Sequence, residues 1–267
     1  MLVCTLGDLV LDVVVRLEAP IAENTDTYGA SRVGAGGQAA NVAAWAAALG
    51  GRARFIGKRA RDGAGRLAAE ELRRHGVELA GPEVENGTGT VVSIATPDGA
   101  RTMLSDRGVA PELGPGELRE EWLGGCDWLH VPGYSLVRSP LRETALSAAA
   151  VAARVSVDLS STAAIEGAGG DVFADLVQRL GPSVVFATEE EQAAAGEIRA
   201  DTLVLKRGAL GCRVLANGVA REYPALPADV VDSTGAGDAF AAGFLLGGPE
   251  LGLEAAARCV AKLGAMP

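Results

Sequence analysis

The chain has 267 residues, of which 48% are hydrophobic, so its length can supply one large core. Its formal net charge of −10 argues against nucleic acid and anionic membranes as partners, because both are bound through basic patches. Four scattered cysteines without a Cys-x-x-Cys pair, with only two histidines, argue against a zinc site or a disulfide framework.

Short β-branched runs alternate along the chain with alanine-rich runs of helical periodicity. We expect strands at Leu2–Leu6, Arg54–Ile56, Trp128–Val131, Val155–Leu159, Val184–Ala187 and Leu203–Leu205, and helices at Gln38–Leu49, Gly65–His75, Leu141–Ala153, Val172–Leu180, Glu189–Ala195, Ala239–Leu246 and Leu253–Leu263. This alternation predicts an α/β fold with a doubly wound, mostly parallel sheet flanked by helices. We expect a single domain over residues 1–267, with the glycine-rich residues 166–170 forming only a loop.

The first apolar run reads as a strand rather than a signal peptide, because it lacks a basic leader and is followed by Asp8 and Asp12. No apolar run is long enough to span a bilayer, so a cytoplasmic location is expected. Asp12 follows this strand, where a carboxylate could bind two adjacent hydroxyl groups. Asp8 is interpreted as an ordinary strand-end residue.

A glycine cluster, Gly34-Ala35-Gly36-Gly37, leads directly into the first predicted helix. Gly36 and Gly37 would let a ligand approach the backbone closely, and Asn41, one turn into the helix, offers both a donor and an acceptor. These residue types suit a polyol. The alternative is close helix packing beneath a glycine turn.

Two regions interrupt the alternation. Residues from about 13 to 33 lack helical periodicity, and residues 88–105 read as a hairpin with a turn at Pro97-Asp98-Gly99. Such strands have no helix to pack against, so we expect them to form a small sheet that projects from one edge. A second hairpin, Gly211–Leu215 with Val219–Tyr223, is expected to extend the main sheet.

The most informative stretch is Asp232-Ser233-Thr234-Gly235-Ala236-Gly237-Asp238-Ala239-Phe240. Its glycines allow a tight turn with bare N–H groups, and the apolar run that follows reads as a buried helix whose positive dipole end faces the turn. Anionic oxygens should bind there, and Asp238 could accept a proton from a substrate hydroxyl. The alternative is an ordinary capped helix start.

These nine residues closely resemble the C-terminal signature of the ribokinase-like (PfkB) carbohydrate kinases, and the resemblance spans essentially the whole chain. It implies that Asp238 is the catalytic base and that Gly235, Ala236 and Gly237 supply the anion hole. It further implies that Asp12, Gly36, Gly37 and Asn41 bind the substrate, and that the small sheet is a lid over the sugar. Gln38 stands where ribokinase has lysine, so the sugar itself stays open.

The resemblance also extends to the phosphate donor. Thr188 stands where the family has asparagine, and Glu191 is the retained acid that would organise Mg²⁺ through water, with Glu190 as the alternative. Without the resemblance, these acids are simply a helix N-terminus stabilised by its dipole. Residues expected near ATP are Lys206, Arg207, Gly208 and Gly211, although Lys206 or Arg207 could instead form salt bridges. No Walker A sequence is present, which disfavours a P-loop fold.

The expected function is ATP-dependent transfer of the γ-phosphoryl group to a hydroxyl of a small sugar or sugar acid. A nucleoside kinase of the same family ranks second, because only Tyr28, Trp45 and Tyr134 could clamp a base near the site. A non-catalytic sugar-binding regulator ranks third. The segment after Phe240 is shorter than in ribokinases, where it walls the adenine pocket, so ADP and GTP stay open as donors. Unprotected lid edges favour a homodimer.

Overall fold

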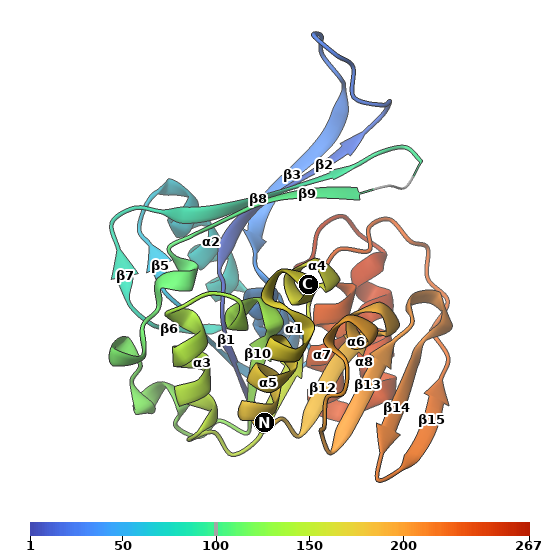
Figure 1. The fold of residues 1–267 in the computed structure, drawn as a ribbon. Helices are drawn as coiled ribbons and strands as arrows, with labels where there is room; N and C mark the ends of the chain where they lie inside the picture. The colour runs from blue at the N-terminus through green and yellow to red at the C-terminus, as the bar shows by residue number, and fades with distance from the viewer. Residues whose placement is uncertain (99–100) are drawn as a thin grey trace.

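The computed structural model describes residues 1–98 and 101–267 and is built around one large sheet (Figure 1). Its strands lie in the order β15-β14-β13-β12-β11-β10-β1-β4-β6. Their bounds are β1 Leu2–Leu6, β4 Arg52–Ile56, β6 Glu78–Ala80, β10 Trp128–Pro132, β11 Val155–Asp158, β12 Val184–Thr188, β13 Thr202–Lys206, β14 Cys212–Ala216 and β15 Val219–Tyr223. Neighbours from β13 to β6 are parallel, and β14 and β15 add an antiparallel edge, which confirms the predicted sheet and its second hairpin.

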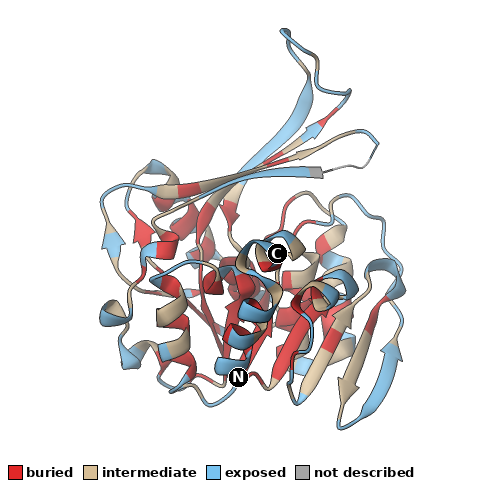
Figure 2. Ribbon diagram, in the orientation of Figure 1, coloured by how far each residue is buried: buried red, intermediate tan, exposed pale blue. Residues whose placement is uncertain are grey.

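Helices cover both faces of this sheet, and side chains alternate between two cores. The helices are α1 Gln38–Ala48, α2 Gly63–Arg74, α3 Leu141–Ala149, α4 Thr162–Ala168, α5 Gly170–Arg179, α6 Glu189–Ala195, α7 Ala236–Gly247 and α8 Pro249–Val260. In β1, Val3 packs in the core with α1, α7 and α8, whereas Cys4 packs in the core with α3 and α5. Both faces of the central strands are therefore buried (Figure 2), as expected for a parallel sheet between helices.

A separate four-stranded sheet, in the order β3-β2-β8-β9, projects from the body (Figure 1). Its strands are β2 Val10–Leu17, β3 Gly29–Gly36, β8 Thr88–Ala95 and β9 Arg101–Gly108. This confirms the expected small sheet, whose strands begin before and end after residues 13–33. The turn predicted at Pro97-Asp98-Gly99 falls partly outside the described residues, since Gly99 and Ala100 are not described.

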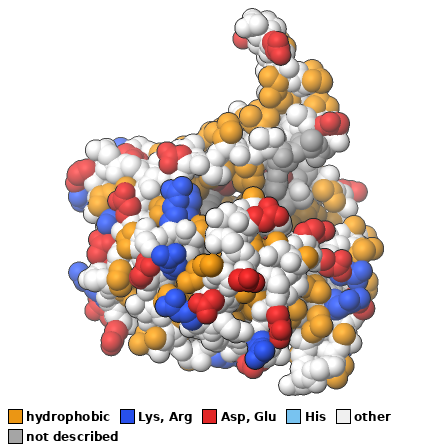
Figure 3. All heavy atoms as spheres, viewed as in Figure 1, with side chains coloured by type: hydrophobic (Ala, Val, Ile, Leu, Met, Phe, Trp, Pro, Cys, Tyr) orange, Lys and Arg blue, Asp and Glu red, His pale blue; other side chains and the backbone are white. Residues whose placement is uncertain are grey.

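Apolar side chains gather along the projecting sheet in the view of Figure 3. Val33 on β3 is 50% exposed and Leu104 on β9 is 59% exposed. Elsewhere, two short strands, β5 Arg59–Ala60 and β7 Glu83–Val84, pair in parallel, and 3₁₀ helices lie at Ala110–Glu112, Pro115–Glu117, Glu120–Leu123, Gly133–Leu136 and Gly208–Leu210. Across the described part of the chain, no helix is long and apolar enough to cross a membrane.

The prediction that residues 166–170 form only a loop is wrong. Residues up to Ala168 belong to α4, and Gly169 alone, at φ +86°, separates α4 from α5. The Ser161 hydroxyl caps α4 by accepting a hydrogen bond from the Ala164 N–H, and Ile165 is fully buried. Capping and burial of one apolar side chain thus outweigh the low helix propensity of glycine.

Candidate active site

Polar residues collect where four strands of the main sheet end. Asp8 lies just beyond β1, Asp158 ends β11, Thr188 ends β12 and Lys206 ends β13. These strands run parallel, so their carboxyl ends meet at one edge of the sheet. Open α/β sheets bind ligands at this edge.

Two helices bring distant parts of the chain into contact at this edge. The Asn41 amide on α1 donates a hydrogen bond from Nδ2 to Asp238 Oδ2 on α7, over 2.7 Å. Each helix begins after a glycine with positive φ, Gly37 at +99° and Gly235 at +76°. The structure therefore joins the predicted polyol residues to the predicted catalytic turn.

Asp238 is deeply buried, with 8% of its surface exposed. Burial raises the pKa of its carboxyl group to about 7, and the carboxylates of Asp158 and Asp12 act in the same direction, whereas the Asn41 hydrogen bond and Lys206 oppose the rise. A carboxyl group that titrates near neutrality can both accept and return a proton in that range.

Asp12 on β2 lies against the backbone of Gly36 on β3. A Cβ atom added at Gly36 would stand 2.0 Å from Asp12 Cγ, so only glycine leaves room for this carboxylate. Burial raises the pKa of Asp12 to about 7, and the nearby Glu71 carboxylate adds to the rise. The carboxylate of Glu71, on α2, is held in place by the Ala35 N–H, which donates a hydrogen bond to its Oε2 over 2.6 Å.

Asp8, interpreted from the sequence as an ordinary strand-end residue, forms an ion pair with the small sheet. It accepts a bidentate pair of hydrogen bonds from Arg107 on β9, with Arg107 Nη2 at 2.7 Å from Asp8 Oδ1. The two side chains are 12% and 14% exposed, so solvent screens the pair weakly. A Cβ atom at Gly37 would lie 2.3 Å from the Asp8 carbonyl oxygen. The pair thus links the projecting sheet to the glycine turn.

The turn that precedes α7 packs closely against the last residues of the chain. A Cβ atom at Gly235 would lie 2.5 Å from Ala265 Cβ, and the Trp45 indole N–H donates to the Ala265 carbonyl over 2.8 Å. Ala236 and Gly237, the next two residues of the predicted anion hole, line a large cavity.

This cavity has a volume of about 590 Å³ and lies between α7, α8 and the segment after β15. Three of the four residues predicted near ATP line it: Lys206, Gly208 and Gly211. Arg207 does not line the cavity. It forms ion pairs with Glu189 at 3.1 Å and Glu222 at 2.9 Å, as in the alternative expectation that this residue forms salt bridges rather than contacting ATP. Although the segment after Phe240 is short, α8 supplies a wall of the cavity through Leu253, Ala256, Ala257 and Val260.

Lys206 closes the inner end of the cavity. Its Nζ donates to Asp158 Oδ2 over 2.6 Å and lies 3.4 Å from where a Gly237 Cβ would stand. Burial lowers the pKa of Lys206, but the Asp158 and Glu191 carboxylates more than offset this and the pKa is raised. The ammonium therefore stays charged beside the turn that precedes α7.

Glu191 caps its own helix. Thr188 and Glu191 form a capping box, in which the Thr188 N–H donates to Glu191 Oε2 over 2.8 Å and the Glu191 N–H donates to Thr188 Oγ1 over 3.1 Å. Burial raises the pKa of Glu191 despite the nearby Lys206. Within residues 1–98 and 101–267, no group of three or more acidic, histidine or cysteine side chains could hold a metal ion. Asp158 and Glu191 still fit Mg²⁺, which needs only one or two carboxylates when phosphates complete its shell.

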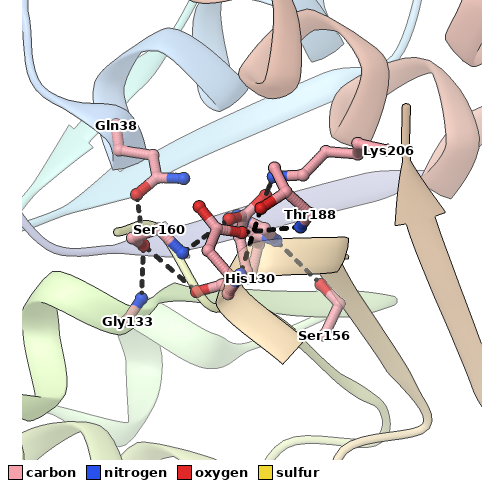
Figure 4. A network of polar contacts seen from close by, with 9 residues as sticks. Gln38, His130, Gly133, Ser156, Ser160, Thr188 and Lys206 are labelled. Carbon is pink, nitrogen blue, oxygen red and sulfur yellow. Dashed lines mark hydrogen bonds and ion pairs between the residues drawn. The ribbon is translucent and has the colours of Figure 1, made fainter. Parts of the chain in front are cut away.

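A second network joins the first helix to this acidic cluster (Figure 4). The Ser160 hydroxyl lies between Gln38 and Gly133: it donates to Gln38 Oε1 over 2.6 Å and accepts from the Gly133 N–H over 2.8 Å. Ser160 has φ +72°, a strained conformation for a residue with a side chain. Below it, His130 is fully buried, and this burial lowers its pKa to about 4, so the ring is neutral.

Sequence reasoning missed Asp158, Ser160 and Glu71. Asp158 carried a usable signal, because it is an acid near the C-terminal end of a predicted strand, Val155–Leu159, and this is the end at which open α/β sheets bind ligands. Glu71 lay in a helix among other charged residues, where nothing distinguishes a buried acid from a solvated one.

Residues 1–266 match the family model for pfkB family carbohydrate kinases. The ATP-dependent ribose-1-phosphate kinase of Halopiger xanaduensis is 31% identical over 275 residues, an alignment that covers 96% of this chain and 90% of that protein.

Solved structures agree in fold. A probable sugar kinase from Rhizobium etli CFN 42 superposes with a TM-score of 0.89 at 24% identity, over 99% of this chain and 94% of that one. The adenosine kinase from Sinorhizobium meliloti gives 0.85 at 25% identity, over 99% and 95%.

Proposed function

The chain belongs to the pfkB family of carbohydrate kinases, and we propose that it transfers the γ-phosphoryl group of ATP to a hydroxyl of a small sugar or sugar acid. The observation that carries the proposal is the 2.7 Å contact between Asn41 and Asp238. It joins the pocket residues of the first third of the chain to a carboxylate that lies beside a cavity of nucleotide size.

The sugar would lie between the small sheet and α1. Asp12 would accept hydrogen bonds from adjacent hydroxyls, while Gly36 and Gly37 let the sugar approach the backbone. Asn41, already fixed by its bond to Asp238, would keep the carboxylate aimed at the acceptor hydroxyl. Asp238 would take the hydroxyl proton as the new O–P bond forms and the bond between the γ-phosphorus and the bridging oxygen of ATP breaks, with ADP as the leaving group.

The transferring phosphoryl group would rest on the backbone amides of Gly235, Ala236 and Gly237 at the positive end of α7. Lys206 would balance the charge on its oxygens. Phosphoryl transfer has a loose transition state, so positioning and neutralisation count for more than the strength of the base.

The donor would occupy the cavity along α8, with Gly208 and Gly211 near its phosphates. Mg²⁺ would be held by the phosphates and, through water, by Glu191, with Asp158 nearby; when bound, it neutralises phosphate charge. Arg207 would act on the donor only if it left Glu189 and Glu222.

The small sheet would act as a lid that excludes water from the reaction and limits ATP hydrolysis. Its exposed apolar residues, Val33 and Leu104, support pairing of two copies through the lid, because such a face is rarely left bare on a monomer.

The test is ADP release from ATP across a panel of sugars, sugar acids and nucleosides. We expect a sugar or sugar acid to stimulate release, and Asp238→Asn to lower the stimulated rate about 10²–10⁴-fold without weakening nucleotide binding. Asp175→Asn, an exposed change of the same chemistry on α5, is the control. Wild-type turnover in the Asp238 variant would refute its role as base.

A nucleoside kinase is the second candidate, supported by the similarity to an adenosine kinase. Of the three aromatic residues considered as a base clamp, Trp45 is 1% exposed and bonded to Ala265, so it is not free to clamp a base. Tyr134 lies near Asp238 and is 37% exposed. Stimulation by nucleosides alone would select this candidate, and sugar binding without ADP release would select a non-catalytic regulator.

A further inference from the structure

The cavity along α8 has polar side chains only at its inner end. Among the described residues that line it, Lys206 and Ser233 alone carry polar side chains. Lys206 is bonded to Asp158 and faces Gly237, and Ser233 lies two residues before Gly235. Both therefore belong to the part of the cavity that would hold phosphates.

The outer part of the cavity is walled by two aliphatic surfaces. One is a single stripe of α8, Leu253, Ala256, Ala257 and Val260, at helical spacing. The other is the coil after β15, which contributes Ala225, Leu226, Pro227, Ala228 and Val230. Leu226 is 48% exposed and Val230 is 70% exposed, which is apolar area that a flat ring would cover.

The coil itself has no fixed set of side-chain hydrogen-bonding groups that would recognise one particular base. Within the described chain, the backbone of residues 225–230 has no hydrogen-bonded partner, and Pro227 has no N–H. A backbone with both free N–H and free C=O groups offers a partner to a donor or to an acceptor on the edge of a ring. Such a coil could therefore meet the amino group of adenine or the carbonyl group of guanine.

We propose that this site takes purine nucleoside triphosphates as phosphoryl donors with little regard to the base. The inference rests on the proposed kinase function and specifies its donor. Strong discrimination between bases requires buried polar groups that the wrong base leaves unpaired, whereas an apolar pocket separates similar ligands by about 10–200-fold at most. With no polar side chain at the outer end, we place ATP and GTP within about tenfold of each other in kcat/KM.

The first test measures binding, so it does not depend on turnover. Displacement of a fluorescent N-methylanthraniloyl ATP by ATP, GTP, ITP and CTP in the presence of Mg²⁺ should give dissociation constants within about tenfold for the three purines. CTP should bind more weakly, because its smaller ring covers less of the aliphatic walls. An affinity for GTP clearly more than tenfold below that for ATP would overturn the proposal.

Two variants of α8 test whether the nucleotide base binds against the apolar stripe of this helix. Ala257→Trp fills the stripe and should weaken ATP and GTP equally, by at least tenfold. Glu254→Trp places the same side chain on the exposed face of α8 and should leave both affinities unchanged. A variant that weakened only one nucleotide would reveal a base-reading group and overturn the proposal.

Kinetics with the best sugar of the panel then separate the two levels of inference. Equal kcat with ATP and GTP is expected, because the phosphate end is the same. If nucleotides bind without base preference but no acceptor is phosphorylated, the kinase function fails and the donor inference stands. If transfer occurs with ATP and falls clearly more than tenfold with GTP, the donor inference fails and the kinase function stands.

Discussion

Replacing the buried acid of α7 should make the protein more stable as it makes it inactive. Burial raises the pKa of Asp238 from an ordinary value of 3.8 to about 7, so the folded protein holds this proton up to a higher pH than the unfolded chain does. Stability is therefore lost as pH rises from about 4 to 7, and the full penalty remains above 7. The difference between the two pKa values corresponds to about 4 kcal/mol.

Asp238→Asn removes the charge and keeps the shape and the bond to Asn41. Above pH 7.5, its free energy of unfolding should exceed that of the wild type by up to about 4 kcal/mol, which is a rise in Tm of roughly 10 °C for a chain of this size. At pH 3 and below the two proteins should be nearly equally stable, since the wild-type carboxyl group is then mostly neutral in both states.

Urea unfolding followed by circular dichroism at pH 8 and at pH 3 measures this difference, with Asp175→Asn as the exposed control. The reasoning is refuted if Asp238→Asn is less stable than the wild type at pH 8. A gain in stability that is the same at both pH values would also refute it, because the gain would then have no electrostatic origin.

Three further outcomes are expected. Below pH 7, log kcat should fall with a slope of about one as Asp238 gains its proton. The fall in log kcat/KM should be steeper, because Asp12 also has a pKa of about 7. Profiles of both parameters that are flat from pH 5 to pH 8 would contradict this. Gly36→Ala should raise the KM for sugar at least tenfold by displacing Asp12, whereas Gly63→Ala, where a Cβ meets nothing within 4 Å, should leave KM unchanged. Leu104→Lys should convert a dimer to a monomer in analytical ultracentrifugation, and a wild type that is already monomeric would remove the basis for lid pairing.

The main sheet could be predicted because its central strands are buried on both faces and alternate along the chain with helices, most of which have clear periodicity. Glu189–Ala195, for example, has the predicted bounds, since its capping threonine and acidic first turn are local signals. The α4 helix could not be predicted, because Gly167 within it and Gly169 and Gly170 just after it outweigh its single buried Ile165 in any local reading. Helix α7 begins three residues earlier than expected, since the tight turn needs only Gly235.

Candidate site residues could be proposed from the sequence where a local motif marks them, and were missed where the information lies in pairing. Asn41 and Asp238 follow glycine turns that mark them in the sequence, and the structure joins these two residues by a hydrogen bond. The partnership of Lys206 with Asp158 depends on strand order, because these residues are 48 apart in the chain and end β13 and β11, the two strands on either side of β12. Local sequence carries no record of such a contact.

The ion pair between Asp8 and Arg107 makes two equilibria depend on each other. Arg107 belongs to the projecting sheet, and the Asp8 carbonyl group lies against Gly37, where the sugar is expected. Anything that favours one orientation of the sheet must then alter sugar affinity, and sugar must favour that orientation by the same factor. If two copies associate through Val33 and Leu104, sugar affinity will rise or fall with protein concentration, and dilution alone will be enough to reveal the sign.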